Sequence, residues 1–165
     1  MPGSGKSTVG RQLARRLQLP FVDADTWVEQ QLGCSIREYF EREGEASFRD
    51  VEEQALAEIA RGAPCVLATG GGAVLRPANR VCLRDHTRVF YLYATPEEVY
   101  RRLRNDQNRP LLQVADPLAR LRELYSQRDA LYRETAHEVI TIGRPSTAAL
   151  VNMIVGLLQP PAAPA

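Results

Sequence analysis

The sequence predicts an α/β domain with a mainly parallel sheet and helices on both faces. Short β-rich apolar runs alternate with longer segments of helical periodicity, an order typical of this class. The first helical segment opens directly after a run of glycines. A chain of 165 residues can bury roughly two thirds of its unfolded surface in one core, so we expect one domain that needs no disulfide or metal for stability.

In the first half of the chain, periodicity and capping residues predict the helices, and apolar runs predict the strands. Apolar residues at 9, 13 and 17 repeat at the spacing of one helix face. Ser35 and Glu38 stand three residues apart, so each side chain can accept a hydrogen bond from the other's backbone N–H at a helix start. The elements expected here are a helix from about Ser7, a strand at 20–22, helices within 26–61 and a strand at 65–68.

The second half of the chain repeats this alternation. Its first strand runs into Thr95, Pro96 and Glu98, which combine a helix cap, a proline at the first helical position and a capping glutamate. Segment 105–117 is polar, carries two prolines and lacks clean periodicity, so we interpret it as a mobile loop over a site. The other elements expected are a strand at 89–94, a helix at 118–135, a strand at 139–142, a helix at 147–158 and a disordered tail at 160–165.

Charge and composition argue against several classes of function. The 21 cationic and 20 anionic side chains give a net charge of +1, so we expect no nucleic-acid or anionic-membrane partner. The longest apolar stretch, 150–158, is too short to span a bilayer. The N-terminal residues show no export or transit pattern, and we expect a cytoplasmic protein. Three widely spaced cysteines fit neither a disulfide framework nor a zinc site.

Lys6 is the one lysine among 21 cationic side chains, and it lies in a glycine-rich segment. Residues 3–8 match the end of the phosphate-binding pattern G-x-x-x-x-G-K-[ST]. Glycines let backbone N–H groups converge on phosphate oxygens, and the following helix points its positive end at the same anion. Lysine adds a compact charge where the wide guanidinium of arginine would not fit, and the Ser7 hydroxyl can bind Mg²⁺. The predicted phosphate site comprises Gly3, Ser4, Gly5, Lys6, Ser7 and Thr8.

Two carboxylates and a triple glycine follow predicted strands. Asp23 and Asp25 stand two residues apart, so we expect both side chains on one face, one near Mg²⁺ and the other near a substrate hydroxyl. A helix cap is the alternative for this pair, because aspartate is common before a helix. The glycines at 70–72 contribute no side chains to a core, so we expect them to let a substrate approach the N–H groups of Gly71 and Gly72.

Six ordered motifs together resemble the shikimate kinase family, from residue 3 to about residue 143. The motifs are residues 3–8, 23–25, 47–49, 70–72, 109–112, and Arg128 followed by Leu131 and Tyr132. The resemblance implies a P-loop NTPase fold of the nucleoside monophosphate kinase type, with strand order 2-3-1-4-5. It also implies ATP-dependent phosphorylation of the 3-hydroxyl of shikimate, on the route to chorismate and the aromatic amino acids, by a monomer that uses Mg²⁺.

The resemblance further implies one kinase domain at 1–159, with a substrate-binding subregion at about 26–61 and a lid at about 105–117. A planar guanidinium recognises a carboxylate through two parallel hydrogen bonds, which suits the carboxylate of shikimate. The implied roles are base or orienting group for Asp25, metal support for Asp23, carboxylate clamps for Arg49 and Arg128, backbone contacts for Gly70, Gly71 and Gly72, charge neutralisation for Lys6, a phosphate contact from the lid for Arg109, stacking on adenine for Arg102 and the opposite adenine wall for Pro145.

Three alternatives are open at this point. A related small-molecule kinase, such as a gluconate kinase, gives no reason for Phe48 and Arg49 together with the triple glycine. The full phosphate pattern needs its first glycine at position 0, after a buried strand that lies in the middle of the family's sheet. The chain is therefore either a non-catalytic remnant with a slot between two strands or, as we favour, a sequence whose translation starts upstream of Met1.

Overall fold

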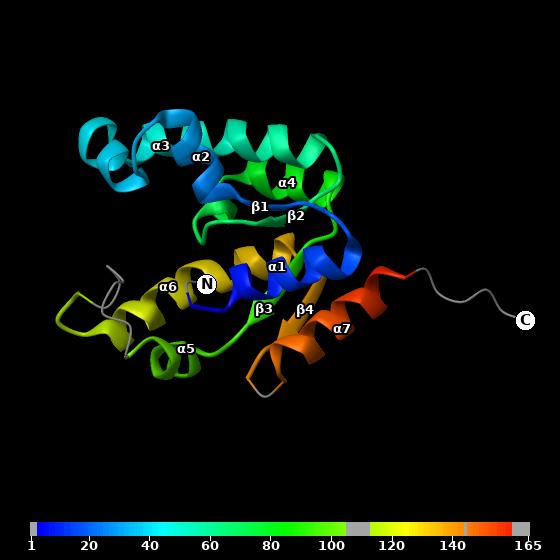
Figure 1. Ribbon diagram of the computed structural model, residues 1–165. Coiled ribbons are helices and arrows are strands. Elements are labelled where there is room, and N and C mark those ends of the chain that lie inside the picture. The colour runs from blue at the N-terminus through cyan, green and yellow to red at the C-terminus, as the bar shows by residue number, and fades with distance from the viewer. Residues whose placement is uncertain (1–2, 105–112, 144, 160–165) are drawn as a thin grey trace, which may run out of the picture.

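The structure is a computed structural model, and it describes residues 3–104, 113–143 and 145–159. Helices surround short parallel strands, as predicted for an α/β domain (Figure 1). The first half contains α1 (Lys6–Leu17), β1 (Phe21–Asp23), α2 (Ala24–Leu32), α3 (Ile36–Arg61), β2 (Val66–Ala68), the 3₁₀ helix η1 (Ala73–Leu75) and α4 (Pro77–His86). The second half contains β3 (Phe90–Tyr93), α5 (Pro96–Leu103), α6 (Pro117–Thr135), β4 (Glu138–Thr141) and α7 (Thr147–Leu158).

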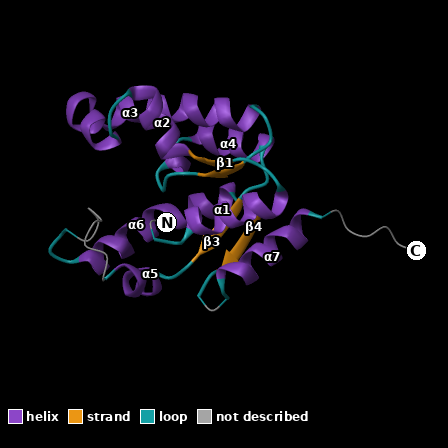
Figure 2. Cartoon of the chain, in the orientation of Figure 1, coloured by secondary structure: helices purple, strands orange, loops and turns teal. Residues whose placement is uncertain are grey.

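The described strands form two separate two-stranded parallel sheets, β1 with β2 and β3 with β4. In the first sheet Phe21 pairs with Val66, and in the second Phe90 pairs with Glu138. Helices α2, α3 and α4 lie on one side of the first sheet, and α1 contacts both strands of that sheet from the other side (Figure 2). Helix α1 also lies side by side with α7, and the two helices share a core with the second sheet. Parallel strands place their carboxyl ends at one edge, so the loops after β1 and β2 meet there.

An apolar cavity of about 510 Å³ separates the two sheets. Val66 and Leu67 of β2 line it together with Tyr91 and Leu92 of β3, and α1 contributes Val9 and other apolar side chains. No hydrogen-bonded ladder joins β2 to β3 among the described strands. The described strands therefore leave a gap between β2 and β3, at the middle of the strand order implied by the family.

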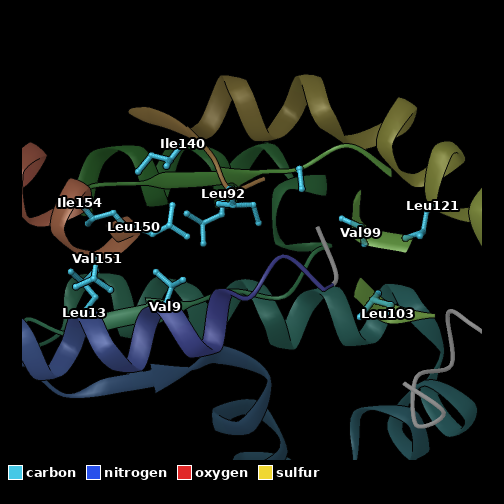
Figure 3. Packing of buried hydrophobic residues seen from close by; sticks show 12 residues of the cluster. Val9, Leu13, Leu92, Val99, Leu103, Leu121, Ile140, Leu150, Val151 and Ile154 are labelled. Carbon is cyan, nitrogen blue, oxygen red and sulfur yellow. The ribbon is translucent and has the colours of Figure 1, made fainter. Parts of the chain in front are cut away.

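The largest hydrophobic core lies between α1, α5, α6, α7 and the second sheet (Figure 3). Full burial of one such aliphatic side chain contributes about 1.5–3 kcal/mol relative to exposure. This core ties the phosphate-loop helix to the C-terminal half of the domain. Its labelled members are Val9, Leu13, Leu92, Val99, Leu103, Leu121, Ile140, Leu150, Val151 and Ile154.

Most of the predicted elements are confirmed, with ends displaced by one or two residues. The capping boxes at Ser35 and Thr95 are both present, and α7 has the predicted bounds. The long α3 is interrupted at Gly44, whose φ of 83° and ψ of 170° are not helical. The prediction missed η1 and α4, although Pro77 at the start of α4 is a usual helix-start signal. The predicted tail at 160–165 and the lid residues 105–112 lie outside the described residues.

Candidate active site

The glycine-rich loop leads directly into the N-terminus of α1. Gly3 and Gly5 adopt positive φ angles of 71° and 80°, which side chains other than glycine rarely adopt. A Cβ atom on Gly3 would also lie 2.6 Å from Cδ1 of Leu103. Lys6 is the first residue of the twelve-residue helix, so its charge adds to the positive end of the helix dipole. This geometry fits the predicted phosphate site.

The two carboxylate oxygens of Asp23 accept hydrogen bonds from different parts of the chain. Its Oδ1 accepts the backbone N–H groups of Asp25 at 3.0 Å and Thr26 at 3.2 Å, which caps α2. Its Oδ2 accepts a hydrogen bond from the Ser7 hydroxyl at 3.4 Å. The helix-cap alternative is thus correct for Asp23, and the same carboxylate also contacts Ser7, the other residue predicted to bind Mg²⁺.

The Ser7 and Asp23 oxygens are ligands of the kind that Mg²⁺ prefers. Within the described residues, no group of three or more histidine, cysteine or acidic side chains is arranged to hold a metal. Mg²⁺ commonly keeps several waters and uses one or two protein ligands together with substrate phosphates. Ser7 and Asp23 at the phosphate loop therefore fit the ion in the manner expected for a kinase.

Asp25 lies in the first turn of α2, and the prediction that it shares a strand face with Asp23 is wrong. The strand ends at Asp23 because the Asp23 cap starts the helix at the next residue. Burial raises the pKa of the Asp25 carboxyl, and the negative charges of Asp23 and Glu52 raise it further, while Lys6 lowers it. A carboxylate with a raised pKa is a better proton acceptor near neutral pH.

The triple glycine forms a tight turn between Asp25 and Arg49. A Cβ atom on Gly70 would lie 2.9 Å from Oδ1 of Asp25, and one on Gly72 would overlap the guanidinium of Arg49. Larger residues would displace both charged side chains. The glycines thus allow two protein side chains to approach the turn closely, and the predicted approach of a substrate to Gly71 and Gly72 stays a prediction.

Arg49 is held by a buried partner that the sequence analysis missed. Its Nη1 donates to Oε2 of Glu52 at 2.7 Å, and Glu52 is only 4% exposed. The Nη2 atom donates to Glu45 at 3.2 Å. Glutamate three residues after arginine on a helix is a usual ion-pair spacing, but the sequence carried no sign that Glu52 would be buried.

Arg128 lies on α6 and faces the same region as Arg49. Burial raises the pKa of the Tyr132 phenol. The positive charges of Arg128 and Arg49 oppose part of this rise, so both guanidinium groups lie near the phenol. The Nε atoms of Arg49 and Arg128 are buried and have no hydrogen-bond partner in the described part of the chain. The two predicted carboxylate-binding arginines thus lie near one phenol, and each keeps one buried donor without a partner among the described residues.

Arg102 reaches the end of β4. Its Nη2 donates to the carbonyl of Ile142 at 2.7 Å, three residues before Pro145. This hydrogen bond holds Arg102 beside the end of β4, and its predicted contact with adenine stays a prediction. Arg109 lies in the segment that the structure does not describe, so its predicted contact with phosphate stays a prediction.

The site and the fold together define a class of protein. A glycine loop on a helix N-terminus, a nearby carboxylate with a raised pKa and parallel strands mark an ATP-dependent small-molecule kinase. A model of the shikimate kinase family matches residues 2–159. The chain belongs to the shikimate kinase family.

Individual relatives agree with this assignment. The chain is 59% identical over 162 residues to shikimate kinase of Paracidovorax citrulli, with 96% of this chain and 88% of the relative covered. It is 52% identical over 167 residues to shikimate kinase of Ralstonia nicotianae, with 98% and 88% covered. A solved structure of shikimate kinase from Acinetobacter baumannii in complex with shikimate matches with a TM-score of 0.87 and 43% identity, covering 94% of this chain and 87% of the other.

These findings confirm the predicted fold and class of enzyme. The chain is a phosphotransferase of a family that acts on a shikimate hydroxyl with ATP. No helix among the described residues is long and apolar enough to cross a membrane.

Proposed function

We propose that this chain transfers the γ-phosphoryl group of ATP to the 3-hydroxyl of shikimate, with Mg²⁺ as cofactor. The observation that carries the proposal is the arrangement around the triple glycine. Asp25 from α2 and Arg49 from α3 lie on either side of this turn, and Arg128 from α6 shares the Tyr132 phenol with Arg49. The two arginines proposed to bind the carboxylate and the aspartate proposed to accept the proton therefore lie around one backbone turn.

The two arginines bind the carboxylate of shikimate. Arg49 is oriented by Glu52 at 2.7 Å, so little side-chain freedom is lost when substrate binds. The buried Nε atoms of Arg49 and Arg128 supply charge-assisted donors. Gly71 and Gly72 contribute N–H groups along the other side of the ring. These contacts fix the position of the hydroxyl that reacts.

Asp25 orients the reacting hydroxyl and accepts its proton as the oxygen attacks the γ-phosphorus. The bond from the γ-phosphorus to the bridging oxygen breaks, and ADP leaves with the electron pair. Phosphoryl transfer has a loose transition state with charge on the equatorial oxygens, so positioning and charge neutralisation dominate. Lys6 and the α1 N-terminus neutralise this charge from one side. Ser7 and Asp23 would hold Mg²⁺, which would supply further neutralisation of phosphate charge.

The adenine lies between Arg102 and the segment at Pro145 in this proposal. Support comes from the 2.7 Å hydrogen bond between Arg102 and Ile142, which holds the side chain next to that segment. Arg109, in the lid, approaches the phosphates after ATP binds and helps to exclude water. The enzyme works as a monomer in the cytoplasm in this proposal, as the resemblance to the family implies.

A coupled assay of ADP release tests the proposal. The purified chain is given MgATP with shikimate, gluconate or a nucleoside monophosphate, and the product is located by ³¹P and ¹H NMR. Only shikimate should accelerate ADP release, with phosphate on the 3-oxygen. Faster turnover of gluconate by folded protein would overturn the proposal, and binding of neither ATP nor shikimate would favour the non-catalytic remnant.

A further inference from the structure

The turn at 70–72 has three carbonyl groups, and each has an identified partner. The Gly70 carbonyl accepts the N–H of Ala73 at 3.2 Å, and the Gly72 carbonyl accepts the N–H of Leu75 at 3.1 Å. The Gly71 carbonyl instead accepts the phenolic O–H of Tyr132 at 2.6 Å. The backbone of η1 thus holds both ends of the turn, and a side chain from α6, 61 residues away, holds the middle.

This single hydrogen bond controls the direction of a substrate-binding donor. The Gly71 carbonyl and the Gly72 N–H belong to one peptide unit, and the described residues contain no cis peptide bond. In a planar trans peptide, the C=O and N–H groups point in opposite directions. Holding the Gly71 carbonyl toward α6 therefore turns the Gly72 N–H toward the opposite side of the turn.

Tyr132 itself is firmly placed. It is 8% exposed, and its ring packs on that of Tyr91 with centroids 5.0 Å apart. Tyr91 in turn donates to Asp129 at 2.9 Å. Tyr132 also follows Arg128 by four residues on α6, so the two side chains lie on one helix face. The phenol oxygen contacts the guanidinium of Arg128, and the positive charge of Arg49 is close enough to affect it.

We infer that Tyr132 is a positioning residue for shikimate binding. Its hydrogen bond fixes the orientation of the 71–72 peptide relative to the arginines proposed to bind the carboxylate. The inference rests on the proposed function. In the described part of the chain, the Tyr132 hydroxyl bonds to the glycine turn and contacts Arg128. Its removal should therefore weaken shikimate binding more than ATP binding.

The variant Tyr132→Phe removes only the hydroxyl and keeps the ring packing on Tyr91. It leaves a carbonyl without its hydrogen bond, so we expect Kd and KM for shikimate to rise about tenfold. KM for ATP should change less than twofold. Tyr91→Phe is the matched control, because it removes a hydroxyl from the same aromatic cluster that contacts Asp129 and not the turn. It should alter thermal stability and leave shikimate affinity unchanged.

A backbone measurement separates positioning from general loosening. In ¹H–¹⁵N spectra, shikimate should shift the Gly72 amide and slow its hydrogen exchange in the wild-type chain and in Tyr91→Phe. Both responses should be lost in Tyr132→Phe. Combining Tyr132→Phe with Arg128→Ala should cost less than the sum of the single losses in shikimate affinity, because the two residues act as a unit.

The outcomes distinguish this inference from the proposed function. If the wild-type chain binds ATP but not shikimate, both are overturned. If the wild-type chain binds shikimate and Tyr132→Phe binds it equally well, only the role of Tyr132 is overturned. Equal losses of affinity for ATP and shikimate in Tyr132→Phe would likewise contradict a positioning role.

Discussion

The proposed shikimate end and the proposed phosphate end of the site are built by different means. At the shikimate end, charged and aromatic side chains hold one another: Arg49 bonds to buried Glu52 at 2.7 Å, and Tyr132 bonds to the glycine turn at 2.6 Å. At the phosphate end, the glycine loop and the N-terminus of α1 supply the site, and the Ser7 to Asp23 contact is long at 3.4 Å.

This contrast indicates which end of the site selects the substrate. A small polyol with one carboxylate must be told apart from other polyols, which requires fixed donors in a defined geometry. Phosphate is a common group that backbone N–H donors and one cation can bind. The shikimate end is therefore preorganised by side-chain contacts, whereas the phosphate end relies on the backbone.

Replacing Lys6 should give the largest effect on catalysis. We expect Lys6→Ala to lower kcat by about 10²–10³-fold, because a charge that stabilises the transferring phosphoryl group is lost. Shikimate affinity, measured by calorimetry, should stay within twofold. Arg11→Ala removes an exposed cation from the same helix and should leave kcat unchanged. A similar kcat for Lys6→Ala and wild type would contradict the phosphate role.

Arg49→Ala should chiefly damage the shikimate end. KM for shikimate should rise about 10–100-fold through loss of charge-assisted hydrogen bonds. The free energy of unfolding should fall by about 3–5 kcal/mol, because Glu52 is left buried and unpaired. Adding Glu52→Gln should restore much of the stability, measured by urea unfolding, without restoring shikimate affinity. Arg42→Ala, an exposed arginine on α3, should change neither quantity.

Gly72→Ala tests the close approach of the turn to Arg49. Its added Cβ would overlap the guanidinium, so we expect a loss of stability of about 1–3 kcal/mol and weaker shikimate binding. Gly156→Ala in α7 is the control, because a Cβ atom there meets no atom within 4 Å. The control should stabilise the chain by about 0.5–1 kcal/mol and leave KM unchanged. Equal behaviour of the two variants in melts and kinetics would refute the packing argument.

The smallest expected effect is the pH dependence from Asp25. Because its pKa is raised, loss of kcat/KM on acidification should begin above the ordinary aspartate pKa of about 3.9. Glu52→Gln removes one charge that raises this pKa, so the acid limb should move to lower pH.

The same raised pKa predicts a change in stability. The native state holds the Asp25 proton more tightly than the unfolded state, so the ionised carboxylate destabilises the fold above the unfolded pKa. Asp25→Asn should therefore raise Tm at neutral pH, and the gain should disappear below about pH 4. An unchanged pH profile of stability in Asp25→Asn would count against a raised pKa.

Local signals were enough for most of the elements. The capping boxes at Ser35 and Thr95 and the span of α7 were predicted because neighbouring residues set them. The position of Asp25 was predicted wrongly, since the Asp23 cap began a helix where a strand end was expected. The prediction also missed α4, and it overlooked Glu52 because burial of a glutamate depends on distant packing.

The sequence by itself determined the class of fold, the glycine-rich loop around Lys6 and the chain's membership of the kinase family, because motifs and periodicity are properties of neighbouring residues. Only the tertiary structure decided that Asp25 and Arg49 touch the glycine turn and that Tyr132 holds its middle carbonyl. These contacts join residues up to 61 positions apart. Their geometry depends on how α2, α3 and α6 lie around the strand end, which no local pattern records.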